Sequence, residues 1–154
     1  MSIILKPYKG ILFYGIEINF GISQKDVNNL LGEKAPKIEI DNIMKEVREQ
    51  RSGMIFCYIN KKLSDITFSM NANLYINDID VFNTNDLLEN LSKIDDPTPE
   101  AKNGYVNFYK LGISIGGFGK RKIPEKRIVT AFCKSRVEFY NFFLKKYVFR
   151  LGDF

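Results

Sequence analysis

Two groups of residues in this sequence have types and spacing that chemistry could use, and the first is a glycine cluster beside a lysine. Gly112, Gly116, Gly117 and Gly119 precede Lys120, which suggests a phosphate-binding loop. That loop requires a lysine followed by serine or threonine at a fixed distance from the first glycine, and here the lysine is followed by arginine. We therefore expect these glycines to form a tight turn or bulge at the end of a strand.

The second group consists of carboxylates. Asp95, Asp96 and Glu100 lie close enough in the sequence to suggest a cation site or a pair of catalytic acids. Pro97 and Pro99 interrupt the group, and no apolar surroundings are present to raise the pKa of either acid. We expect a solvated loop.

The sequence contains no histidine. This excludes Ser–His and Cys–His nucleophile pairs and most zinc sites. With no convergent acid–base pair elsewhere, we expect no enzyme, no metal site and no cofactor. Cys57 and Cys133 lie in apolar runs typical of strands, and we expect both to be buried free thiols.

The sequence carries no signal for a membrane or for export. No run of eighteen apolar residues is present, so we expect no membrane span. The N-terminal MSIILKPYKG has a short apolar run and an early proline, unlike a secretory signal. We expect a cytoplasmic protein.

The composition indicates one folded domain of the α+β class. The 154 residues are 45% hydrophobic and 14% aromatic, which is enough to bury a core. The expected elements are a mostly antiparallel sheet, one helix in each half and a C-terminal helix at 135–150. We expect a single domain over 1–154, built either as one unit or as two pseudo-repeated halves, 1–70 and 71–134.

The stretch Gly104–Phe118 predicts the hairpin around which the sheet is built. It alternates β-forming residues, turns at Lys110–Gly112 and carries a second apolar run, so we expect it at the centre of the sheet, with Phe108 and Ile115 buried. Ile11–Phe20 and Met54–Ile59 also have the pattern of strands.

Two internal helices are expected, one in each half. Ser23 caps the first, whose buried stripe is Val27, Leu30 and Leu31 and which ends at Gly32. The second spans Thr84–Leu91, with Leu87, Leu88 and Leu91 facing inward. Lys37–Gln50 fits either a helix or a strand, and an extended segment is favoured.

The charges are strongly segregated along the chain. Between Asn77 and Glu100 seven acids stand against one base, Lys93, whereas between Lys110 and Arg150 eleven bases stand against two acids. The net charge of +5 therefore hides a bipolar molecule. An acidic stretch can steer a basic protein partner, and a basic stretch with interleaved aromatic residues can attract nucleic acid. Ordinary solvated surface is the third interpretation of both stretches.

For the acidic stretch, Tyr75 is the candidate aromatic anchor of a protein-binding patch, although a place in the core fits it equally well. The candidate partner-binding residues are Tyr75, Asp78, Asp80, Asp86, Glu89, Asp95 and Asp96.

A motif in the hairpin, together with GIEINFGISQKDVNNLLG near the N-terminus, resembles a known family. Residues Phe108–Phe118 read FYKLGISIGGF, and a strand-like segment, Ile128–Phe132, follows. The pattern is similar to that of small bacterial immunity proteins, which accompany polymorphic or contact-dependent growth-inhibition toxins. The likeness covers about half the chain, and the basic net charge departs from the acidic character of nuclease inhibitors.

The resemblance implies a protein without catalysis that binds a cognate toxin domain and occludes its active site or cofactor site. A nuclease is the expected toxin, because sites that bind polyanionic substrates are basic and complement an acidic stretch. The alternative is a nucleic-acid-binding module that uses the basic C-terminal third. A protein toxin is the expected partner in preference to nucleic acid.

Overall fold

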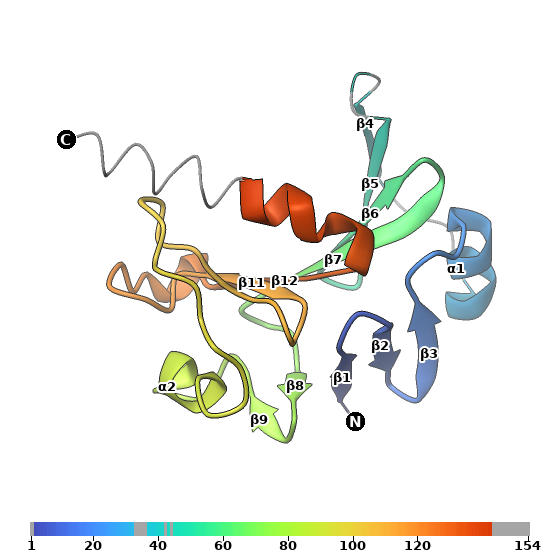
Figure 1. Cartoon of the computed structure of the whole chain (residues 1–154). Coiled ribbons are helices and arrows are strands. Elements are labelled where there is room, and N and C mark those ends of the chain that lie inside the picture. The colour runs from blue at the N-terminus through green and yellow to red at the C-terminus, as the bar shows by residue number, and fades with distance from the viewer. Residues whose placement is uncertain (1, 33–36, 42, 44, 143–154) are drawn as a thin grey trace.

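A computed structural model describes residues 2–32, 37–41, 43 and 45–142 of the chain (Figure 1). It is an α+β structure, as the sequence predicts, but its strands form two sheets instead of one. Sheet A has five strands in the order β3-β2-β1-β8-β9, and sheet B has seven in the order β10-β11-β12-β7-β6-β5-β4. Buried apolar residues of both sheets form one cluster, so the core lies between them.

Sheet A is the smaller layer, in the lower part of Figure 1. Its strands are β1 (Ile3–Lys6), β2 (Gly10–Phe13), β3 (Ile16–Asn19), β8 (Leu74–Ile76) and β9 (Ile79–Asp80). All its pairs are antiparallel except β1 with β8, which run parallel. The single strand expected over Ile11–Phe20 is thus two strands, because Tyr14 and Gly15 form a tight turn with φ of 46° and 85°.

Sheet B is antiparallel throughout. Its strands are β4 (Lys37–Asp41), β5 (Glu46–Arg51), β6 (Met54–Ile59), β7 (Lys62–Ser69), β10 (Val106–Phe108), β11 (Ile113–Gly116) and β12 (Ile128–Phe132). The extended interpretation of Lys37–Gln50 is therefore confirmed. The predicted halves meet where β7 pairs with β12 and where β1 pairs with β8, so each half contributes to both sheets. The pseudo-repeat itself stays a prediction.

The predicted hairpin exists as β10 and β11, but its expected central position is wrong. β10 is an edge strand, and the middle of sheet B is formed by β12, β7 and β6. A loop covers the outer edge of β10: Thr98 N donates to Asn107 O at 2.9 Å, and Asn107 N donates to Thr98 Oγ1 at 2.9 Å. The loop thus forms hydrogen bonds with backbone groups of this edge, to which another strand could otherwise pair. Phe108 and Ile115 are buried, as predicted.

Side chains alternate across sheet B, and this alternation gives the sheet two different faces. The core face carries apolar residues, among them Phe56, Ile66, Phe68, Val129 and Ile113. The opposite face, called here the outer face, carries mainly polar residues, among them Cys57, Asp65, Thr67, Ser114 and Thr130. The outer face is therefore not part of the hydrophobic core.

Helical segments accompany the sheets, among them a short 3₁₀ helix, η1 (Pro124–Lys126), between β11 and β12. In α1 (Gln24–Leu31) the Ser23 hydroxyl accepts a hydrogen bond from Asp26 N, Val27 is buried and Gly32 ends the helix with φ of 68°, as the sequence predicts. Leu30, expected in the buried stripe, is 43% exposed.

The helix expected over Thr84–Leu91 is shorter: α2 spans Leu87–Leu91, with Leu87 and Leu91 buried and Leu88 only partly so. Thr84 does not cap it, because the Thr84 hydroxyl donates to the carbonyl of Asp80.

The C-terminal segment begins with a 3₁₀ turn, η2 (Lys134–Arg136), and continues as a helix over residues 137–142. The remainder of the helix predicted over 135–150 lies outside the described residues. Within the part of the chain that the structure describes, no helix has both the length and the apolar character needed to cross a membrane. Both cysteines are free thiols; Cys57 is buried as expected, whereas Cys133 is only partly buried.

Candidate functional site

The acidic residues predicted to bind a partner lie on the β8–β9 hairpin, on α2 and in the segments on either side of α2. Asn77 and Asp78 form the two-residue turn between the strands, with φ of 45° and 65°, a conformation that Asn and Asp adopt more readily than most residues. The turn leaves Asp78 exposed at the tip. Asp80 is partly buried on β9, where the Asn83 amide donates to both of its carboxylate oxygens at 3.1 Å.

The next acids are presented by α2. Leu87 and Leu91 anchor this helix in the core, so Asp86 and Glu89 lie outward and are exposed. Asp96, after the helix, is also exposed. The five acids accessible on this segment, called here the acidic surface, are Asp78, Asp80, Asp86, Glu89 and Asp96.

Tyr75 lies beside the acidic surface and is partly buried on β8. Its hydroxyl is 3.5 Å from Asp80 Oδ2, the outer limit of a hydrogen bond. With Asp78 it lines a cleft of about 470 Å³, whose other walls are Ser2, Ile4, Leu5, Asn73 and Asn77. Tyr75 is therefore outside the buried core and is accessible from a cleft.

Asp95 does not belong to the acidic surface, contrary to the prediction. It is 6% exposed, and its Oδ2 accepts hydrogen bonds from the backbone N–H groups of Lys110 at 2.8 Å and Leu111 at 3.0 Å. The carboxylate thus fastens the turn between β10 and β11. The loop that contains it is not simply solvated, because Asp95 satisfies backbone groups of another segment.

The glycine cluster forms bends that also depend on a carboxylate. Gly117 has φ of 78°, and Glu100 Oε1 accepts a hydrogen bond from Lys120 N at 2.7 Å. A side chain at Gly119 would overlap the Glu100 carboxylate. The backbone donor that a phosphate loop would offer is thus occupied by an acid, which agrees with the predicted turn.

The outer face of sheet B forms a cavity that the sequence did not predict. It has a volume of about 470 Å³ and is lined by strands of sheet B, by residues of the 101–105 loop and by the C-terminal segment. Its charged residues form two groups, one around Asp65 and one around Glu46.

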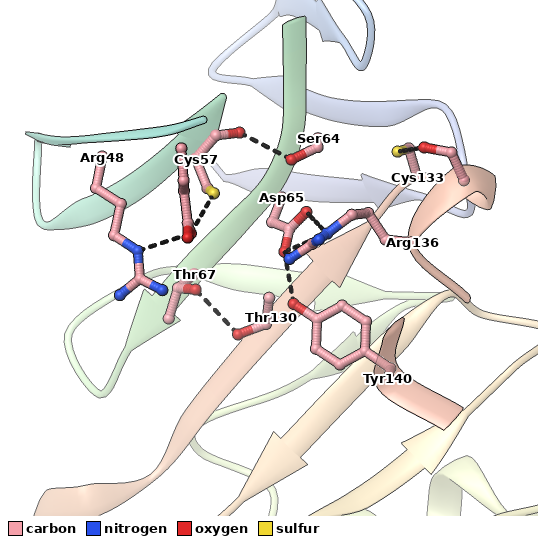
Figure 2. Close-up of polar contacts among 11 residues, drawn as sticks. Arg48, Cys57, Ser64, Asp65, Thr67, Thr130, Cys133, Arg136 and Tyr140 are labelled. Atoms are coloured by element: carbon pink, nitrogen blue, oxygen red, sulfur yellow. Dashed lines mark hydrogen bonds and ion pairs between the residues drawn. The ribbon is translucent and has the colours of Figure 1, made fainter. Parts of the chain in front are cut away.

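Asp65 fixes the C-terminal segment over this cavity. Its carboxylate is buried and accepts hydrogen bonds from Arg136 Nε at 3.1 Å and from the Tyr140 hydroxyl at 2.6 Å (Figure 2). The Tyr140 ring stacks on Phe132 with centroids 4.3 Å apart, and the Arg136 guanidinium lies 3.8 Å from the Phe139 ring centroid.

The environment around Asp65 sets the protonation of its two donors. Burial, followed by the negative charge of Asp65, raises the pKa of Tyr140, so the phenol remains a donor. Burial opposes the charge of Arg136, but the Asp65 carboxylate outweighs that effect and raises the pKa of Arg136. Charge-assisted hydrogen bonds therefore hold the C-terminal segment against β7.

Glu46 organises the second group. Its Oε1 accepts hydrogen bonds from the Cys57 thiol at 2.9 Å and from Arg48 Nε at 2.9 Å. Burial acts to raise the pKa of Glu46, but these two hydrogen bonds and the positive charges of Arg48 and Arg136 together outweigh it and lower the pKa. Burial and the Glu46 contact raise the pKa of Cys57, so the thiol stays protonated and is a poor nucleophile.

Comparisons with known proteins do not identify the chain: no family model, no curated protein and no solved structure matches it. Within the described ranges, no three side chains among Cys, Asp and Glu lie close enough together to hold a metal ion. The candidate sites are therefore the acidic surface with its cleft and the cavity on the outer face of sheet B.

Proposed function

We propose that this protein is an immunity protein that binds a cognate toxin domain, a nuclease, and occludes its active site or cofactor site without catalysis of its own. The observation that supports this proposal is the acidic surface, in which Asp78 is exposed and lines a cleft together with Tyr75. The proposal places the protein in the cytoplasm, where the two free thiols would remain reduced.

The local charge of the acidic surface matters more than the net charge of the protein. At physiological ionic strength, charges separated by more than about 8 Å are largely screened, so a partner approaching β9 and α2 responds mainly to the acids there. A nuclease active site is basic because its substrate is a polyanion. Complementary charge would speed the encounter, and an aromatic side chain in an adjoining cleft would supply the buried anchor that charge alone rarely provides.

Contacts within the basic C-terminal third weigh against the nucleic-acid alternative. Arg136 is paired with Asp65, and the Arg127 guanidinium lies 4.9 Å from the Phe118 ring centroid. Lys134 Nζ lies 5.2 Å from the ring centroid of Tyr8. These cations have partners inside the protein, whereas Lys120, Arg121 and Lys122 form a run of exposed bases within the described residues.

The first test is co-expression with the toxic C-terminal domain of a large secreted protein encoded by a neighbouring reading frame. We expect the protein to restore growth and to form a stoichiometric complex with that domain. Cell death despite expression of the folded protein, together with no complex on mixing, would rule out the proposal for that toxin.

Reversing charge on the acidic surface should slow association with this toxin domain. The double variant Asp86→Lys/Glu89→Lys removes two exposed carboxylates without touching the buried leucines of α2. At low ionic strength we expect the association rate constant to fall about tenfold, with weaker salt dependence and an unchanged melting temperature. Stopped-flow mixing measures the association rate constant of the variant and of the original chain.

The matched control is Glu125→Lys/Glu138→Lys, which makes the same change in net charge at exposed acids outside the acidic surface. It should leave association unchanged or nearly so. Equal slowing by both double variants would show that only the net charge matters.

Tyr75→Ala should instead raise the dissociation rate constant, because an anchor acts after the encounter.

A nucleic-acid-binding assay distinguishes an immunity protein from the alternative, a nucleic-acid-binding module. Fluorescence anisotropy with generic single-stranded and double-stranded DNA should show at most weak retention near physiological salt. The triple variant Lys120→Glu/Arg121→Glu/Lys122→Glu should leave that retention unchanged. Tight binding that falls steeply with salt and disappears in the triple variant would instead support the nucleic-acid-binding module.

A further inference from the structure

The floor of the cavity on the outer face of sheet B is a row of uncharged hydrogen-bonding side chains. Asn107, Ser114, Thr130 and Thr67 are direct register partners on the adjacent strands β10, β11, β12 and β7, and all four line the cavity. Neighbouring strands lie about 4.8 Å apart, so the row presents four polar groups at regular spacing over roughly 14 Å. Four strands carry it, which makes it a rigid surface.

Two members of this row are buried without a full set of partners. Ser114 is 5% exposed and Asn107 is 4% exposed. The Asn107 amide donates to the Tyr109 hydroxyl at 3.2 Å, but its carboxamide oxygen and the Ser114 hydroxyl have no hydrogen-bond partner among the described residues.

Buried polar groups are normally hydrogen-bonded. In the described part of the chain, the one side-chain polar atom that is sealed off without a partner is Arg127 Nε. The free oxygens of Ser114 and Asn107 are therefore open to the cavity and available to a ligand.

The charges around the row cancel. Glu46 is paired with Arg48, and Asp65 is paired with Arg136. A charged ligand would lose hydration on entering the cavity, and each opposite charge there is already engaged by a carboxylate or a guanidinium of the protein. The cavity therefore favours an uncharged ligand.

Aromatic rings form part of the cavity wall. Tyr105, Phe139 and Tyr140 line it, and Tyr105 lies so close to β11 that a Cβ at Gly116 would be 2.9 Å from its ring. Only glycine at position 116 leaves room for this placement. Aromatic surfaces together with a few fixed polar groups are typical of small-molecule sites, and a volume of about 470 Å³ lies within their usual range of about 300–1,000 Å³.

We propose that this cavity binds a neutral sugar of one or two rings. Sugar hydroxyls both donate and accept, as do Ser114, Thr67 and Thr130, and the carboxamide oxygen of Asn107 accepts. The apolar C–H faces of the sugar rings would pack against the aromatic wall. The site is separate from the acidic surface, and the proposal does not depend on toxin binding.

Titration of the ¹⁵N-labelled full chain tests this assignment. The probes are N-acetylglucosamine and maltose, with glucosamine and glucuronate as charged single-ring counterparts of N-acetylglucosamine. We expect saturable shifts of the amide signals of the row, including the Asn107 side-chain amide, with the neutral sugars. The charged counterparts should bind at least about tenfold more weakly, a difference of about 1.4 kcal/mol.

Two variants locate the binding. Ser114→Ala removes a hydroxyl with no partner in the protein, and Thr130→Val keeps the shape of the side chain but loses its hydrogen bond to Thr67. Each should weaken binding at least about tenfold while the protein remains folded in its amide spectrum. Ser69→Ala, an exposed change on β7 outside the cavity, is the matched control and should bind as the original chain does.

Three outcomes would overturn the proposal. The first is the absence of saturable shifts with either neutral sugar. The second is shifts that persist unchanged in both cavity variants. The third is equal affinity for the neutral and charged probes, which would show that the cancelled charges do not select the ligand.

Discussion

Replacing Arg51 by methionine is expected to lower the free energy of unfolding by about 3–5 kcal/mol, because the change leaves a buried carboxylate without its counter-charge. The side chains of Arg51 and Glu49 are both fully buried, and Arg51 Nε lies 2.5 Å from Glu49 Oε1. Arg51 also donates to Asn28 of α1, so the pair ties sheet B to the helix. Methionine keeps much of the side-chain volume, so the loss reports charge and hydrogen bonding more than an empty space. Urea unfolding followed by circular dichroism measures it.

The double variant Glu49→Leu/Arg51→Met provides the control for the first prediction. It removes both charges, and buried ion pairs replaced by apolar side chains often cost little. We expect it to be more stable than Arg51→Met alone, although the Tyr58 hydroxyl and the Gln24 amide then lose the carboxylate that they now contact at 2.7 and 2.8 Å. If Arg51→Met were as stable as the original chain, the Arg51 guanidinium would not be needed to balance the charge of Glu49.

Phe108→Ala is expected to cost about 3–5 kcal/mol, the usual range for removal of a large aromatic side chain from a core. Phe108 is fully buried, although β10 is the edge strand of sheet B, because its ring points toward the core cluster while the loop at residues 97–98 covers the edge of its backbone. Thermal unfolding should show a clear fall in melting temperature.

A matched phenylalanine exists for this measurement. Phe142 is 63% exposed, and its replacement by alanine should change the stability much less. If Phe108→Ala had the same melting temperature as the original chain, the β10–β11 hairpin would not contribute to the cooperative core.

Features that depend on neighbouring residues could be predicted from the sequence. The cap at Ser23, the buried Val27 and the stop at Gly32 lie within one helix, so their signals are local. The turns at Ser52–Gly53 and Asn60–Lys61 likewise have a local signal, because each contains one residue that tolerates positive φ, Gly53 or Asn60.

Features that depend on distant segments could not be predicted. The alternation in Gly104–Phe118 indicates a hairpin but does not say which strand lies beside it, and so its edge position was missed. Asp95 looked solvated because two prolines follow it, yet the turn that buries it is formed by Lys110 and Leu111. Its burial is a consequence of tertiary structure.

The same distinction holds for the candidate sites. The exposure of Asp78, Asp86 and Glu89 followed from a turn and from the outer side of a short helix, so the acidic surface could be found from the sequence. The row of polar groups in the cavity comes from four strands. In the sequence, this row is indicated by a polar residue in the middle of an otherwise apolar strand, such as Ser114 between Ile113 and Ile115.

The order in which the strands pair bears on how the chain is made in the cell. Ile3 in the first strand pairs with Leu74, and Ile66 in β7 pairs with Ala131 in β12. During translation, the first half therefore emerges with two unpaired strand edges, one in each future sheet. The edge of β1 can pair as soon as β8 (Leu74–Ile76) emerges, whereas the edge of β7 stays open until β12 (Ile128–Phe132) has left the ribosome. Pairings of such long sequence separation form slowly, and open edges invite contacts between chains. The nascent chain is consequently most exposed to aggregation and to proteases just before β12 is released, so a premature stop before Ile128 should yield a product that the cell clears instead of a smaller working protein.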